Sequence, residues 1–344
     1  MAKFPTTLLE ATRYFADEKR CIDTVASLRW PDGKPTCPKC GVAEGKREHY
    51  WLDTQKRWKC YACRKQFSVK VNSIFEDSAV SLDKWLTALW MLCNCKNGIS
   101  SYEIARDLKL TQKSAWFVLQ RLRTVLQTQT VEKMGGENGN PTEIDETFVR
   151  GSPRNRHFGE RMKTAQSVKN EDGVMVKNPH FRENRGRRSD KAAVFGVLDR
   201  EARRVRACVI PGIQRDVLQN LILENVSKGS RVYSDGLREY MGLGALGFVH
   251  ETMNHIEGYV RGEVHKNGIE NFWSLLKRSL RGTYVGVEPF HLDRYVTEQV
   301  FRFNNRTAED NPLNDGDRFA LALSQISGER LTFAELTGKV PTSA

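Results

Sequence analysis

Three acidic residues, far apart in this 344-residue chain, have residue types and settings suited to metal-dependent chemistry. Asp145 lies in the alternating segment 143–149, Asp235 follows Val232-Tyr233-Ser234 and precedes Gly236, and Glu270 begins a segment with helical periodicity. Carboxylate oxygens are preferred ligands of Mg²⁺ and Mn²⁺, and two such ions need several carboxylates that converge on one point. The three acids are therefore candidate ligands of a two-ion site.

Each acid also has an ordinary interpretation. Asp235-Gly236 is a common turn pair, and a glutamate near a helix start is an ordinary stabilising residue. Asp145 in the middle of an apolar strand is less ordinary, because a buried carboxylate is costly unless it is paired or bound to metal. Residue types alone leave both interpretations open.

The elements expected around these acids follow one another in the order of an RNase H-like mixed sheet. Alternation and apolar runs predict strands over 143–149, 192–198, 204–210 and 231–233, with a helix over 217–226. The helix predicted from residue 270 places Glu270 and Lys277 on the same face, two turns apart. That spacing lets the glutamate hold a metal ion while the lysine reaches an anionic substrate beside it.

Four of the eight cysteines have the spacing of a structural zinc site. Cys37-Pro38-Lys39-Cys40 and Cys60-Tyr61-Ala62-Cys63 are separated by 19 residues, so two tight turns can present four thiolates to one ion. The alternative is two disulfides, which a reducing compartment disfavours. Cys93-Asn94-Cys95 has no matching pair for a second site. We predict a zinc ribbon, preceded by one helix over 7–29.

A helix-turn-helix is expected after the ribbon. Ser100 and Glu103 predict a capped helix over 102–108, and a second helix is expected over 112–126. The second helix is predicted to expose polar and basic side chains as a DNA-recognition helix does, namely Gln112, Lys113, Gln120, Arg121 and Arg123. An ordinary helical hairpin is the alternative.

The charge of the chain favours a polyanionic partner. The net charge is +12, and segment 150–190 alone holds eleven Lys and Arg against five acids. We expect this insertion, which includes Arg185, Arg187 and Arg188, to contact the DNA backbone, although a solvated loop is the plain alternative. No stretch approaches the roughly 20 apolar residues of a membrane helix, and the start lacks a signal peptide, so we expect a cytoplasmic protein without a membrane partner.

From about residue 15 to residue 337, the chain resembles transposases of the IS1595 family, ISXO2-like group. The matching parts are the ribbon, Leu28–Gly33, Ile144–Thr147, Ser234–Gly236, Ile269–Arg278, Gly282–Tyr284, His291–Tyr295 and Phe301–Arg306. The resemblance implies an RNase H-like catalytic domain whose acidic triad falls on Asp145, Asp235 and Glu270, with Lys277 as basic companion and Arg278 beside it at the DNA. Some members carry Asn as the third ligand, so Asn271 is the alternative to Glu270.

The activity that the resemblance implies is cleavage and strand transfer of DNA with two Mg²⁺ or Mn²⁺ ions, beside one structural zinc. The expected partner is double-stranded DNA, both the terminal inverted repeats of the element and the target DNA. The chain is also expected to form a homo-oligomer on DNA, at the bacterial nucleoid. The alternatives are an inactive DNA-binding regulator and a structure-specific nuclease of the same fold.

The expected fold class is α/β, with an RNase H-like mixed-sheet domain behind a zinc ribbon and a helix-turn-helix region. The expected limits are 1–75 for the N-terminal helix and ribbon, 76–134 for the helix-turn-helix region, 135–141 for a linker, 142–306 for the catalytic domain and 307–344 for a C-terminal tail.

Overall fold

The computed structural model describes residues 4–126, 132–136, 141–150, 167–169, 175–177, 191–253, 267–309, 311–328 and 331–338. The chain divides into two compact units, one made of residues 1–129 with 297–344 and the other of residues 130–296. The boundary at residue 296 falls inside helix α9 (Pro289–Asn304). Among the helices described, none has the length and apolar character needed to cross a membrane.

Two helices begin the first unit, where the sequence predicted one. Helix α1 (Leu8–Phe15) and helix α2 (Glu18–Arg29) are separated because Asp17 adopts an extended conformation and accepts hydrogen bonds from the amides of Lys19 and Arg20. An aspartate in this role starts a new helix, since it satisfies amides that lack a partner in the first turn. The prediction of a single helix was therefore wrong.

The ribbon is a three-stranded antiparallel sheet in the order β1-β2-β3, with β1 at Tyr50–Leu52, β2 at Arg57–Lys59 and β3 at Gln66–Phe67. A short 3₁₀ helix, η1 (Asp53–Gln55), joins the first two strands. Trp58 stacks on Phe67 with ring centroids 5.7 Å apart, and Trp30 from the end of α2 meets Trp58 edge-on at 5.3 Å. The sheet thus shares its small core with the helix before it, as a ribbon of this size requires.

Helices α3 (Leu82–Asn94), α4 (Ser101–Asp107) and α5 (Gln112–Thr124) complete the N-terminal part of this unit. The predicted capping box of Ser100 and Glu103 is present. The C-terminal helices α10 (Asp315–Leu323) and α11 (Phe333–Leu336) belong to the same unit. Phe319 of α10 packs against Phe15 of α1 with ring centroids 5.3 Å apart, so the two ends of the chain share one core.

The second unit is built on a five-stranded mixed sheet in the order β10-β9-β4-β7-β8. Strand β4 (Thr142–Arg150) is antiparallel to β7 (Lys191–Asp199), which is antiparallel to β8 (Arg204–Ile210). On its other side, β4 is parallel to β9 (Arg231–Asp235), which is parallel to β10 (Val249–Met253). The predicted mixed α/β fold with an N-terminal ribbon is confirmed.

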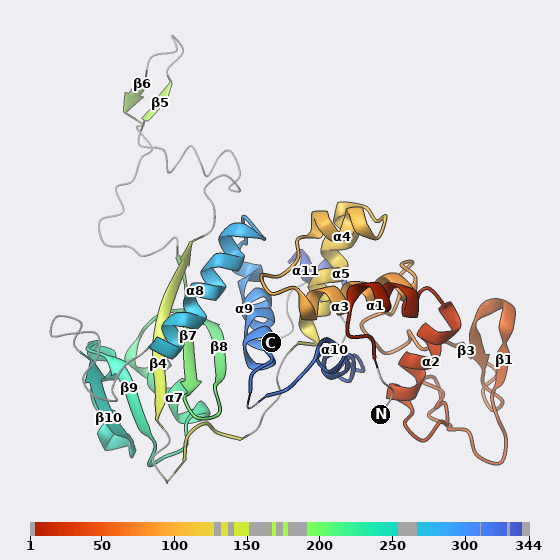
Figure 1. The fold of residues 1–344 in the computed structure, drawn as a ribbon, viewed down its shortest axis with the longest axis horizontal. Helices are drawn as coiled ribbons and strands as arrows, with labels where there is room; N and C mark the ends of the chain where they lie inside the picture. Colours follow the sequence, from red (N-terminus) through yellow and green to blue (C-terminus); the bar gives the residue numbers. More distant parts are fainter. Residues whose placement is uncertain are drawn as a thin grey trace. The chain divides into compact units, whose positions relative to one another are not determined.

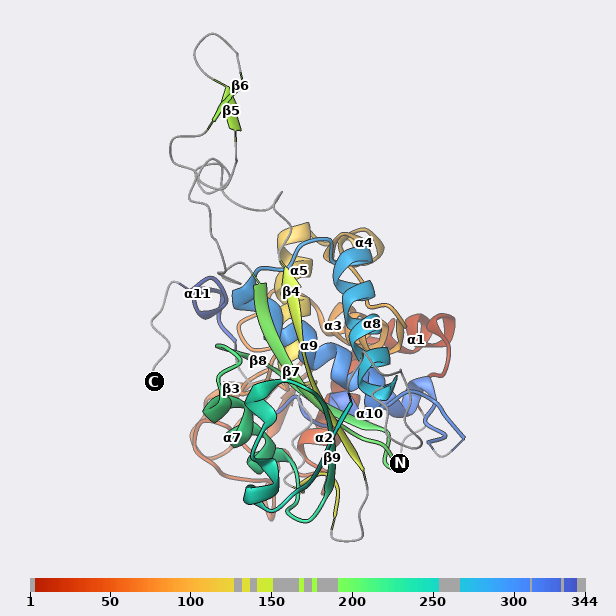
Figure 2. The ribbon, with the colours of Figure 1, turned by 90° about the vertical axis from the view of Figure 1, so that its left-hand side faces the viewer.

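Helices cover both faces of this sheet. Helix α7 (Arg215–Asn225) and the 3₁₀ helices η3 (Arg238–Tyr240) and η4 (Leu243–Leu246) pack on the face that carries Ile144, Phe195 and Val232. Helix α8 (Asn267–Gly282) lies on the opposite face (Figures 1 and 2). Because side chains alternate along a strand, Glu143 and Asp145 of β4 project toward α8. Two short paired strands, β5 (Ser167–Lys169) and β6 (Met175–Lys177), lie within the basic insertion.

Candidate functional site

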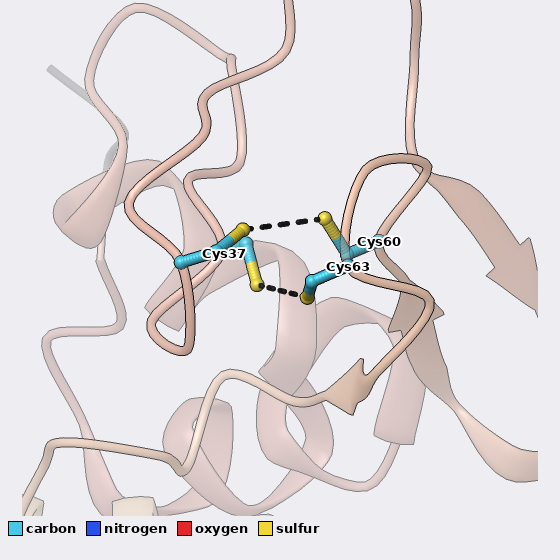
Figure 3. A group of neighbouring side chains, drawn as sticks. Cys37, Cys60 and Cys63 are labelled. Atoms are coloured by element: carbon cyan, nitrogen blue, oxygen red, sulfur yellow. Dashed lines mark hydrogen bonds between the residues drawn. The ribbon is translucent and has the colours of Figure 1, made fainter.

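The four ribbon cysteines form a group with the dimensions of a zinc site. The sulfur atoms are 3.8 Å apart between Cys37 and Cys63 and 3.7 Å apart between Cys40 and Cys60, and all four lie within 4.8 Å of one another (Figure 3). With Zn–S bonds of about 2.3 Å, the edge of a tetrahedron is about 3.8 Å. A disulfide would need sulfurs only about 2.05 Å apart. The geometry therefore fits a closed structural zinc site and not two disulfides.

The remaining cysteines behave as small apolar residues. Cys21 and Cys93 are buried in the core of the first unit, and Cys95 packs against it. Burial raises the pKa of the Cys21 thiol to about 12, and that of the Cys208 thiol to about 11. These thiols stay protonated at neutral pH, so they are poor metal ligands.

Asp145 and Asp235 lie on neighbouring parallel strands at matching positions. The pairing of β4 with β9 joins Thr142 to Val232 and Glu143 to Tyr233, and Asp145 and Asp235 each lie two residues beyond the last of these pairs. Residues opposite each other on adjacent strands point to the same face of the sheet. Both side chains are half-buried, and Asp235 Oδ1 accepts a hydrogen bond from the amide of Leu237 at 3.1 Å.

Tyr240 holds Glu146, the neighbour of Asp145 on β4, from the sheet face opposite α8. Its hydroxyl donates a 2.6 Å hydrogen bond to Oε2 of Glu146, which neighbours Asp145 on β4. Burial raises the pKa of Tyr240, and the negative charges of Glu146, Asp145 and Asp235 act in the same direction. The phenol therefore stays protonated and serves Glu146 as a hydrogen-bond donor.

The N-terminus of α8 is attached to the sheet by Glu143. This carboxylate is 1% exposed. Its Oε2 accepts a 2.8 Å hydrogen bond from the amide of Ile269, and its Oε1 pairs with Nε of Arg200 at 2.7 Å. The guanidinium of Arg200 lies over the ring of Tyr233 at 4.6 Å. A carboxylate at a helix N-terminus is favourable, since it satisfies an unpaired amide and faces the positive end of the helix dipole.

A second contact of α8 reaches Asp145 itself. The indole nitrogen of Trp273 donates a 3.0 Å hydrogen bond to Oδ2 of Asp145. Glu270, which is exposed, precedes Trp273 by three residues and follows Ile269 directly, so it lies in the stretch of α8 attached to β4. This places the helix that carries Glu270 over the strand that carries Asp145.

The other predicted residues of α8 are accessible to solvent. Lys277 is half-buried, four residues after Trp273 and seven after Glu270, and Arg278 and Asn271 are exposed. The buried side of α8 is formed by the apolar side chains Ile269, Phe272, Trp273, Leu276 and Leu280. Glu270 and Lys277 keep the common helical face that the sequence predicted for them.

The three acids do not themselves form a compact ligand cluster. Within the part of the chain that the structure describes, the four cysteines are the only group of at least three His, Cys, Asp or Glu side chains spaced to hold an ion. Like charges disfavour a close approach of three carboxylates unless a cation lies between them. Convergence of Asp145, Asp235 and Glu270 on shared ions remains a prediction.

Two arginines predicted to contact DNA are buried, so the predicted exposure of this part of α5 was wrong. Arg121 is 3% exposed and donates to three backbone carbonyl oxygens, those of Leu331 at 2.7 Å, Ile74 at 2.9 Å and Glu76 at 2.7 Å. Arg123 is 1% exposed and pairs with Glu298 at 2.6 Å. Gln120 is also buried. The second half of α5 lies inside the first unit, where these arginines serve packing.

The start of α5 differs from its end. Gln112 and Lys113 are exposed, and the ammonium of Lys113 lies 4.9 Å from the ring of Phe333. These side chains stay available to a partner. Arg185, Arg187 and Arg188, which were also predicted to contact DNA, lie outside the described residues.

Sequence reasoning missed Glu143, Gly196 and Trp273 as parts of the site. Glu143 lacked a signal because a charged residue at a strand end is commonly exposed. Gly196 could have been noticed, since a glycine inside the apolar strand 192–198 often marks a close approach by another group. Trp273 fits the apolar face of a helix that begins near Glu270, but its indole nitrogen also needs a hydrogen-bond acceptor, which helical periodicity does not identify.

Comparison with known proteins agrees with this architecture. Residues 138–304 match the model of the ISXO2-like transposase domain, and residues 16–66 match that of a transposase zinc-ribbon domain, both of the IS1595 family. The chain is also 27% identical over 295 residues to an uncharacterized protein in transposable element ISH50 of Halobacterium salinarum, covering 84% of this chain and 93% of that protein. The two matched domains cover more than half of the chain, and the chain belongs to the IS1595 family of insertion-sequence transposases.

Proposed function

We propose that this transposase binds the ends of its insertion sequence and both cleaves and joins DNA strands with two divalent metal ions. Two observations support the proposal. Strands β4 and β9 are paired in parallel, with Asp145 and Asp235 each two residues beyond the pair of Glu143 and Tyr233. The hydrogen bond from Trp273 to Asp145 holds the helix of Glu270 over β4. On this proposal, the sheet in the order β10-β9-β4-β7-β8 is an RNase H-like catalytic core.

The donor set fits magnesium or manganese. Hard cations prefer carboxylate oxygens, and Asp145, Asp235 and Glu270 offer three carboxylates from three different elements. Asp145 and Asp235 are half-buried on strands, whereas Glu270 is exposed. On this proposal, Glu270 turns toward the two aspartates by a change of rotamer when the ions bind. When bound, two such ions would activate the attacking hydroxyl and stabilise the leaving oxygen.

The residues of the chain itself have distinct tasks in this proposal. Asp145 and Asp235 would bind the ions from two strands of the same sheet, which hold the backbone of both residues in place. Lys277 and Arg278 lie further along α8 and would neutralise DNA phosphates near the site. In the first unit, α4 and α5 would bind the element ends as a helix-turn-helix through side chains such as Lys113, and the ribbon would assist them.

The basic insertion and the assembly complete the proposal. Segment 150–190 has an excess of six positive charges, which favours contact with the DNA backbone. Because two element ends must be joined, we propose that the chain acts as a homo-oligomer on DNA, in the cytoplasm at the nucleoid.

The test compares Asp145→Asn, Asp235→Asn and Glu270→Gln with the exposed control Glu201→Gln. Each variant is incubated with labelled element ends, target DNA and Mg²⁺, beside a mobility-shift assay. The proposal expects each of the three to lose cleavage and joining while end binding persists, and expects the control to keep all activities. Full joining by any of the three refutes its assignment.

The wild-type protein separates the alternatives in the same assay. Binding without cleavage would indicate a DNA-binding regulator, and cleavage without joining would indicate a structure-specific nuclease. Asn271→Ala tests whether the neighbouring amide replaces Glu270 as the third ligand, since activity would then depend on Asn271 and not on Glu270.

A further inference from the structure

Strand β7 contains a glycine that makes room for one particular side chain. Gly196 pairs with Asp145 across the β4–β7 ladder. A Cβ added at Gly196 would lie 2.7 Å from Cη2 and 2.8 Å from Cζ2 of Trp273, and 3.1 Å from Cδ1 of Ile269. Distances this short are not tolerated by atoms in contact, so the indole lies directly on the backbone of β7. Any larger residue at position 196 would displace the indole.

The position of the indole is fixed by this packing, and its one polar atom is directed at Asp145. Trp273 is 4% exposed. Its Nε1–H can only donate, and it donates to Oδ2 of Asp145 at 3.0 Å. A hydrogen bond from a rigid, buried ring restricts the rotamer of the carboxylate that accepts it.

We propose that Trp273 is a positioning residue for the metal site, with Gly196 as the space that admits it. The proposal rests on the function proposed above, in which Asp145 and Glu270 are metal ligands. Trp273 belongs to the same helix as Glu270 and donates a hydrogen bond to the carboxylate of Asp145 on β4. One side chain would therefore orient Asp145 and also set where Glu270 approaches it. Metal affinity should therefore depend on the indole nitrogen as well as on the carboxylates.

The competing explanation is that Trp273 only fills the space between helix and sheet. Two variants separate the explanations. Trp273→Phe keeps an aromatic ring but removes the N–H donor. Gly196→Ala keeps the indole and its N–H but pushes the ring away from β7. If Trp273 positions Asp145, both variants weaken metal binding, although they change packing in different ways.

The experiment uses the full-length, zinc-loaded protein and titrates Mn²⁺ by calorimetry. Trp273→Phe and Gly196→Ala are each expected to weaken Mn²⁺ binding by about 10- to 100-fold, the usual effect of removing a group that orients a metal ligand. Gly244→Ala is the matched control, because Gly244 is exposed and an added Cβ there would meet no atom within 4 Å. Circular dichroism and thermal unfolding check that each variant is folded.

Spectroscopy supplies a second readout. Trp273 is the only tryptophan between residues 130 and 296, and the other six lie in the first unit. Mn²⁺ bound beside this indole should quench its fluorescence, so the quenching should be smaller in Trp273→Phe than in Trp116→Phe. Quenching of equal size in the two variants would show that the ion binds away from this indole and would overturn the proposal.

The outcomes distinguish this inference from the proposed function. A folded Trp273→Phe protein that binds Mn²⁺ as tightly as the wild type overturns the role of Trp273. If that variant does not fold, unchanged Mn²⁺ affinity in Gly196→Ala overturns it equally. If instead Asp145→Asn leaves the Mn²⁺ affinity of the protein unchanged, the proposed metal site itself is wrong, and the role of Trp273 fails with it.

Discussion

Glu143 provides the most direct test of how helix α8 is held on the catalytic sheet. The substitution Glu143→Gln keeps the size of the side chain but removes its negative charge. It weakens two interactions of one buried carboxylate, the ion pair with Arg200 at 2.7 Å and the hydrogen bond from the Ile269 amide at 2.8 Å. We predict a loss of stability in the second unit and a local loss of order at the start of α8.

The expected magnitude follows from the burial of the two partners. Removing one member of a buried ion pair costs about 3–5 kcal/mol. Arg200 retains 16% side-chain exposure and its contact with Tyr233, and glutamine still offers an oxygen to the amide of Ile269. We therefore expect a loss of about 2 kcal/mol, which corresponds to a ~30-fold change in the unfolding equilibrium and, for a unit of this size, a fall in Tm of about 4–8 °C.

Hydrogen exchange of the full-length protein, followed by mass spectrometry, measures the effect where it should occur. Peptides that cover residues 267–273 should exchange about 30-fold faster in Glu143→Gln than in the wild type, while those of α3 in the first unit should not change. Glu201→Gln, which removes an exposed acid in the turn after β7, is the control. Unchanged protection of residues 267–273 would refute the role of Glu143 as the attachment of α8.

Three further predictions concern other parts of the molecule. Chelation of zinc, or Cys40→Ser, should unfold the ribbon and lower the zinc content from one ion per chain, as elemental analysis and near-UV circular dichroism can show; a folded ribbon without zinc would contradict this. Arg121→Ala should lower the free energy of unfolding by about 3 kcal/mol, because two buried carbonyls and one partly buried carbonyl lose their donor. Lys113→Ala should instead weaken DNA binding at unchanged stability. Burial lowers the pKa of His250 below 6.5 in the folded protein. As the pH falls, the imidazole is therefore protonated in the unfolded chain before it is protonated in the folded one. The free energy of unfolding should decline from about pH 6.5 down through the lower pKa of the folded state. His250→Gln should flatten that decline, and equal pH slopes of wild type and variant would exclude the effect.

The local features of this protein could be predicted from sequence. The two pairs of cysteines specify the zinc site because each pair needs only a tight turn, and the spacing of two residues makes that turn. The capping box at Ser100 and the strands that carry Asp145 and Asp235 follow from neighbours a few residues away. Such features depend on contacts between residues that are close in the sequence, so the local sequence is enough to predict them.

Helix limits already depended on more than periodicity. The apolar stripe over residues 7–29 continues through Asp17, yet the chain forms two helices, because the aspartate side chain caps the second one. The predicted limits of the linker, 135–141, and of the catalytic domain, 142–306, remain predictions.

What only the tertiary structure decided is which residue lies against which. Arg121 and Arg123 fit the pattern of a recognition helix but are buried, because carbonyl groups and a carboxylate from distant segments of the same unit surround them. The surroundings of these two arginines are set by residues 45 to 210 positions away in the sequence, and helical periodicity carries no information about such contacts. The contact between Gly196 and Trp273 has the same origin. The missing side chain of Gly196 leaves space that the indole fills, and this contact exists only because α8 packs on the sheet.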